Sequence, residues 1–221
     1  MKKKGFDYIG TIDNFEIPKW WECGWRRVSC GKDECKLCGR INQDRLLHIM
    51  KGEDPESMEN VLADVGNSFK DALLMIKQDA AEKGIDITNI KEQELDELPE
   101  PDEFQLYNEL AEWHGSISTI FTTATLMGSA WFYTEAAADL EWYSNMLLSK
   151  TYRQLCNRWE LDRGDQYGHI DYKYTKYVLN ECIRILKKAL SDLSSFNLSQ
   201  GKEFSAILQK LMTFEKSIVR I

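Results

Sequence analysis

Four cysteines within sixteen residues are the part of this chain best suited to chemistry. Cys23, Cys30, Cys35 and Cys38 have the spacing C-x6-C-x4-C-x2-C. The basic start of the chain is not followed by an apolar segment, so we expect no secretory signal and a cytoplasmic location. Thiols at this density most often bind a metal ion, whereas disulfides would need an oxidising compartment. The spacing therefore predicts a metal site formed by these four cysteines.

The last two cysteines form the most regular part of the pattern. The segment Cys35-Lys36-Leu37-Cys38-Gly39 resembles the CxxCG knuckle of zinc ribbons and rubredoxins. In that motif both thiols face one ion, and the glycine allows a tight turn whose N–H groups point at sulfur. Gly31 follows Cys30 in the same way and predicts a second tight turn.

The fourth ligand and the metal are both open to an alternative. Six residues separate Cys23 from Cys30, so His48 is an alternative to Cys23 as the fourth ligand. A closed tetrahedral site made of such ligands predicts a structural Zn²⁺ ion. The run Cys30-x4-Cys35-x2-Cys38 also resembles that of plant-type ferredoxins, which implies an iron–sulfur cluster as the alternative cofactor.

The charge distribution divides the chain into dissimilar parts. The chain has 221 residues and is 43% hydrophobic, which is ordinary for globular proteins. Residues 1–51 hold eleven Lys and Arg against seven Asp and Glu, whereas the remainder hold seventeen against twenty-nine. We predict a Cys-rich metal-binding module at 1–52, a connecting helix within 53–90, an acidic linker at 91–103 and a four-helix bundle at 104–221. No apolar stretch is long enough to predict a membrane span.

Beyond the cysteines the chain has the periodicity of helices. Asp54 and Pro55 predict a helix start, and Gly84 predicts its end. Apolar residues then recur every three or four positions in four further segments, beginning near Phe104, Trp131, His169 and Gln200. The first of these stripes includes Leu110, His114, Ile117, Phe121 and Ala124. Short connections favour an antiparallel up-and-down bundle, so the fold class is mainly α.

The residues before the cysteines are aromatic and basic. Apolar residues on either side of Asp13 and Asn14 indicate one or two short strands. Trp20, Trp21 and Trp25 surround the first cysteine and precede Arg26 and Arg27, a combination that can stack on single-stranded bases. The alternative, which we favour, is that the tryptophans supply the apolar core of a small module.

Arg163 and His169 are separated by five residues at the start of the third predicted bundle helix. This pattern resembles the R-x4–6-H motif of HEPN-type ribonucleases, whose domains are helical bundles. The resemblance implies that the arginine holds the scissile phosphate while the histidine assists proton transfer. The alternative is an interhelical turn in which Arg163 stabilises a helix C-terminus.

The sequence favours a non-enzymatic function. We expect a metal-binding adaptor or regulatory protein that acts through protein contacts, with homodimerisation and RNA binding as further partner hypotheses and no membrane partner. The alternatives are an RNA-cleaving or RNA-binding protein that uses Arg163 and His169, and an iron–sulfur redox or sensor protein.

Overall fold

The protein is mainly helical. The computed structural model describes residues 8–12, 15–28, 35–82, 84, 97–164, 169–196 and 200–221. Contacts group the chain into two compact units, which are described separately below. One comprises Met1–Phe6 and Ser29–Glu97, and the other comprises Asp7–Val28 and Leu98–Ile221.

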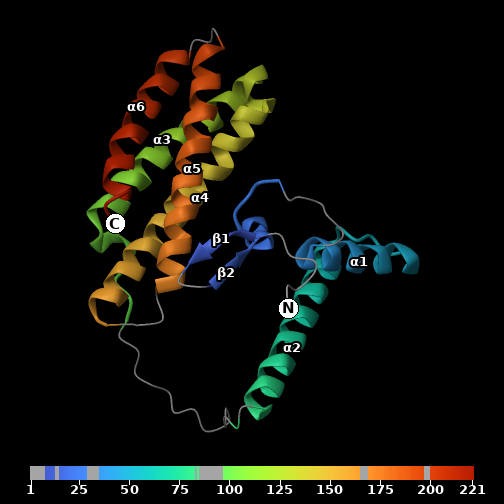
Figure 1. The fold of residues 1–221 in the computed structure, drawn as a ribbon. Helices are drawn as coiled ribbons and strands as arrows, with labels where there is room; N and C mark the ends of the chain where they lie inside the picture. Colours follow the sequence, from blue (N-terminus) through green and yellow to red (C-terminus); the bar gives the residue numbers. More distant parts are fainter. Residues whose placement is uncertain are drawn as a thin grey trace. The chain divides into compact units, whose positions relative to one another are not determined.

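Four helices make up most of the second unit (Figure 1). They are α3 (Gln105–Met127), α4 (Glu135–Asp162), α5 (His169–Ser195) and α6 (Gly201–Ile218). Each packs against the next in the chain, and α3 also packs against α6. The apolar stripes that predict these helices supply the core, because residues three or four positions apart share one helix face. The prediction of a mainly helical protein is therefore confirmed.

Short 3₁₀ turns, η3 (Pro101–Glu103) and η4 (Ala130–Tyr133), precede α3 and α4. Gly128 ends α3 with a left-handed backbone (φ 61°), a conformation that costs glycine little. The hydroxyl of Thr134 then accepts a hydrogen bond from the Ala137 N–H and caps α4. Helix α4 therefore begins at Glu135 rather than near Trp131, whose indole is buried in the core.

Two short strands precede the bundle in the chain. Strand β1 (Tyr8–Ile12) pairs in antiparallel fashion with β2 (Phe15–Pro18), and the 3₁₀ helix η1 (Lys19–Gly24) follows. Ile17 and Trp25 are buried in the same core as the bundle residues. Their burial removes a large apolar area from water, which explains why this segment groups with the bundle. This grouping divides the segment 1–52 that the sequence suggests as one module.

The first unit contains two helices, α1 (Lys36–Lys51) and α2 (Met58–Glu82). Gly52 ends α1 with a left-handed backbone (φ 75°), and its N–H donates to the Ile49 carbonyl. The Arg40 guanidinium reaches the Asp71 carboxylate at 2.8 Å, and His48 Nε2 reaches Asp64 at 3.1 Å. The two helices therefore form a hairpin held by charged side chains.

None of the helices in the described residues has the continuous apolar length that a bilayer span requires.

Candidate metal centre

Cys35 and Cys38 lie at the N-terminus of α1. Cys35 is the N-cap residue, with an extended backbone (φ −71°, ψ 128°), and Cys38 follows in the first helical turn. The Gly39 N–H donates to the Cys35 carbonyl at 2.7 Å, which is the first hydrogen bond of the helix. Gly39 is therefore helical, and the predicted tight turn after Cys38 is wrong. The first helical turn replaces it because residues three apart on a helix already share a face.

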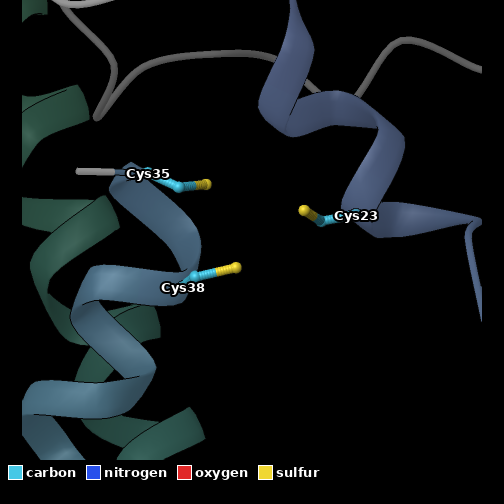
Figure 2. A group of neighbouring side chains, drawn as sticks. All are labelled: Cys23, Cys35 and Cys38. Carbon is cyan, nitrogen blue, oxygen red and sulfur yellow. The ribbon is translucent and has the colours of Figure 1, made fainter. Parts of the chain in front are cut away.

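The thiols of Cys23, Cys35 and Cys38 converge. Their sulfur atoms all lie within 4.8 Å of one another. Figure 2 shows Cys35 and Cys38 extending from one helix toward Cys23, with the three sulfurs turned toward a common point. Cys38 is buried and the other two are half-buried. Three close cysteines, one of them shielded from solvent, can bind a metal ion.

The spacing of the sulfurs can be compared with that of a tetrahedral site. A Zn–S distance near 2.3 Å places the sulfurs of such a site roughly 3.8 Å apart. The sulfurs of Cys23, Cys35 and Cys38 form one group within 4.8 Å, which is a set that can hold one ion. At the N-terminus of α1 the first N–H groups have no acceptor within the helix. Their partial positive charge favours the binding of thiolates. The donor set and its surroundings therefore suit a thiophilic cation.

The other cysteines have different outcomes. Cys30 and the turn predicted at Gly31 lie outside the described residues. The five described cysteines are not in disulfides. Cys156 and Cys182 are buried in the bundle, where burial raises the thiol pKa of Cys156 and raises that of Cys182 to about 12. These two side chains act as small hydrophobic residues of the core.

His48 has carboxylate partners on both sides of its ring. Its Nδ1 lies 2.6 Å from a Glu53 carboxylate oxygen, and its Nε2 lies 3.1 Å from an oxygen of Asp64. Hydrogen bonds to Glu53 and Asp64 raise the pKa of His48, because two carboxylates favour the imidazolium form. Both ring nitrogens are engaged by carboxylates, so these contacts favour Cys23 over His48 as a ligand.

A hydrogen-bonded network fixes the 3₁₀ helix that carries Cys23. Glu22 accepts hydrogen bonds from the Arg26 guanidinium at 3.0 and 3.1 Å and from the Tyr177 hydroxyl at 2.7 Å. Burial alone would raise the pKa of Glu22, but the hydrogen bonds from Arg26 and Tyr177 outweigh it and leave the pKa lowered. The Tyr174 hydroxyl also donates to the Trp21 carbonyl at 2.9 Å. These contacts hold η1 against α5.

Trp25 and Arg27 attach the end of this segment to α4. Trp25 is 1% exposed and lies edge-on to the rings of Tyr143 and Tyr177. The Arg27 guanidinium donates to Asp139 at 2.7 Å and pairs with Glu135. Trp25 is therefore a core residue, but of the bundle core and not of a separate small module as the sequence suggests. Its ring is not accessible for stacking on a base.

The sequence gives little sign of this network. The spacing of Glu22 and Arg26, four residues apart, is the one signal that could have suggested their pairing. Their tyrosine partner lies 155 residues from Glu22, a separation that no local pattern predicts.

Arg163 and His169 lie at consecutive helix ends. Arg163 is the C-cap residue of α4, and its guanidinium lies 3.7 Å from the ring centroid of Trp159. His169 is the first residue of α5. Both side chains are exposed, and the segment 165–168 between them lies outside the described residues.

Comparisons of this chain with models of protein families, with curated proteins and with solved structures found no match.

Proposed function

We propose that the chain is an adaptor protein with a structural zinc site, which acts through protein contacts of its helices. The observation that supports this proposal is the convergence of three thiols within 4.8 Å. In this proposal Cys23, Cys35 and Cys38 supply three ligands and Cys30 supplies the fourth.

Zinc is the ion in this proposal, and an iron–sulfur cluster is the alternative. Zn²⁺ takes four ligands around one centre, and the four clustered cysteines of the sequence supply that number. The iron–sulfur alternative requires space for several irons and sulfides among the cysteines. The two cofactors differ in colour and in elemental content, so one preparation distinguishes them.

A non-catalytic role follows from the number of cysteines. Four protein ligands close the coordination sphere, whereas catalytic zinc sites keep one position for water or substrate. Cys30 is close enough in sequence to the other three to complete the set. The proposed zinc therefore contributes stability, and the helices supply the surfaces for partners.

Metal analysis of cysteine variants tests this proposal. Cys35→Ser and Cys38→Ser should each lower the bound zinc to less than a tenth of the wild-type content, because loss of a thiolate opens the site. Cys156→Ala is the matched control, since this cysteine is buried in the bundle and should leave the zinc content unchanged. His48→Gln should also retain the metal. Full zinc content in Cys38→Ser would overturn the ligand assignment.

RNA cleavage by Arg163 and His169 is the second candidate function. The observation that favours it is that both side chains are exposed at the end of α4 and the start of α5. A guanidinium and an imidazole at one helix connection can hold a phosphate and transfer a proton. The test is cleavage of a labelled single-stranded RNA by wild type and His169→Ala. Equal activity in the two proteins, or none in wild type, would exclude this assignment.

A further inference from the structure

Helix α2 carries an apolar stripe that faces solvent in its own unit. Seven large side chains on this stripe are 40–72% exposed, and the small Ala72 lies among them. The seven large residues are Met58, Val61, Leu62, Val65, Phe69, Leu73 and Ile76. At about 100° per residue they fall within roughly 120° of the helix circumference. A continuous apolar face of this length is the usual sign of an interaction surface.

The partner helix of the hairpin does not cover this stripe. Helix α1 is joined to α2 through Arg40 and His48, which reach Asp71 and Asp64. Those two aspartates lie seven residues apart, roughly 130° around α2 from the centre of the stripe. The charged contacts thus fix α1 on a different side of α2, and the stripe faces away from it.

The positions of the apolar residues along α2 suit an antiparallel pair of identical helices. These positions are symmetric about Asn67, so that Met58 corresponds to Ile76, and Val65 corresponds to Phe69. The same symmetry pairs Val61 with Leu73 and Leu62 with Ala72. A two-fold interface places the same patch of both copies face to face, so each apolar residue would meet an apolar residue.

The charges beside the stripe specify the same orientation. Glu59 near the start of α2 and Lys77 near its end are eighteen residues apart, which is five helical turns, so they flank the stripe on one side. In an antiparallel pair Glu59 of one copy lies opposite Lys77 of the second copy. The two-fold symmetry repeats this pair, so the dimer contains two of them. A parallel pair would instead leave Glu59 and Lys77 of the two copies five helical turns apart, so this pairing could not form.

The stripe is large enough for a specific but modest interface. Full burial of a large apolar side chain removes about 90 Å² from water. Seven such side chains, each about half exposed, therefore give about 700 Å² of apolar surface on two copies of the stripe. Homodimer interfaces are about 65% apolar, so this apolar area implies a total buried surface, apolar and polar together, of about 1,100 Å². That value clears the roughly 1,000 Å² expected of a biological interface.

We propose that α2 is a homodimerisation helix, which pairs with α2 of a second copy of this chain in antiparallel orientation. This inference is independent of the metal site, because none of the residues on which it rests is a ligand of the proposed zinc ion. The dimer therefore should persist in Cys38→Ser, and failure of one proposal does not entail failure of the other.

Two adjacent leucines provide a matched test. Leu73 lies on the stripe and Leu74 lies off it, yet they are 56% and 57% exposed. Sedimentation velocity of the full chain over a range of concentrations should show a monomer–dimer equilibrium. Leu73→Glu should weaken dimerisation at least tenfold because it places a carboxylate in the apolar seam, whereas Leu74→Glu should leave it unchanged. Both side chains are exposed, so neither change should unfold the helix.

Charge reversal tests the orientation. Lys77→Glu should weaken the dimer several-fold, and the double variant Glu59→Lys with Lys77→Glu should restore it. A wild-type chain that stays monomeric at high concentration would overturn the proposal and leave the stripe to a different partner. Equal weakening by Leu73→Glu and Leu74→Glu would also overturn it.

Discussion

Replacement of Trp25 by alanine should destabilise the helical bundle, although this residue lies far from the bundle helices in sequence. The Trp25 indole is 1% exposed, and its ring lies 6.3 Å from that of Tyr143 and 6.2 Å from that of Tyr177. Its carbonyl accepts a hydrogen bond from the Trp142 indole N–H at 2.8 Å. The substitution removes an aromatic side chain from between α4 and α5 and leaves a cavity.

The size of the effect follows from this burial. Replacement of a buried tryptophan by alanine typically costs about 3–5 kcal/mol, because lost transfer energy and the cavity add together. For a unit of this size each kcal/mol lowers the melting temperature by roughly 2–4 °C, so the expected decrease is about 6–20 °C. This loss is a large fraction of the roughly 5–15 kcal/mol that stabilises a typical domain.

Thermal unfolding followed by far-UV circular dichroism provides the measurement, since α3 to α6 contribute most of the helical signal. Trp25→Phe is the matched control, because it keeps an aromatic ring in the site and leaves a smaller cavity, so it should cost clearly less than Trp25→Ala. A Trp25→Ala protein that melts within 2 °C of wild type (about 1 kcal/mol or less) would refute the packing of this segment on the bundle.

Three further predictions concern titratable groups. The folded-state pKa of Glu22 is lowered from its usual 4.5, so the stability from its contact with Arg26 is present above that value and lost as pH falls below it. Urea unfolding should show this decline in wild type and a flatter profile in Glu22→Gln. The folded-state pKa of His48 is raised above 6.5, so its contribution is complete below 6.5 and lost as pH rises through the raised pKa. An NMR titration of His48 should give a midpoint above 6.5 that falls in Glu53→Gln; an unchanged midpoint in that variant would contradict the contact. Cys182, with its pKa raised to about 12 and no exposed surface, should resist alkylation at pH 8 until the protein is denatured, and rapid labelling of native protein would refute its burial.

Much of the bundle could be predicted from the sequence because apolar periodicity depends on local spacing. Leu110, Ile117 and Phe121 are buried as the stripe predicts. The same stripe places His114 in the core, which is wrong, since Trp113 is buried at that level and His114 is half-buried. The Trp113 indole N–H donates to the Ile207 carbonyl, and that partner on α6 cannot be read from the pattern of α3.

The second half of α4 shows a different reason for failure. Thr151, Gln154 and Asn157 are fully buried, whereas the more apolar Leu155 and Trp159 of the same helix are half-buried. Periodicity assumes that the most apolar face is buried, but the position of α5 decides which face of α4 is covered. Polar residues on that face follow from the packing and not from composition.

The ligand residues of the candidate metal site could be predicted from the sequence, whereas the backbone conformation around them could not. The spacing of Cys35 and Cys38 identifies two ligands, and their sulfurs do lie close to that of Cys23. The resemblance to a knuckle predicts a turn at Gly39, where the chain instead begins α1. Two thiols separated by two residues can face one ion from a turn or from a first helical turn, so the spacing alone does not distinguish them.

The metal content of the wild-type chain tests the central proposal most directly. Protein purified without oxygen or added metal should be colourless and contain one zinc ion per chain by elemental analysis, and this zinc should be lost in Cys38→Ser. A coloured protein that contains iron and sulfide would contradict the zinc assignment and favour the iron–sulfur alternative. A wild-type protein that binds neither metal, even after incubation with Zn²⁺ under reducing conditions, would contradict the metal site altogether.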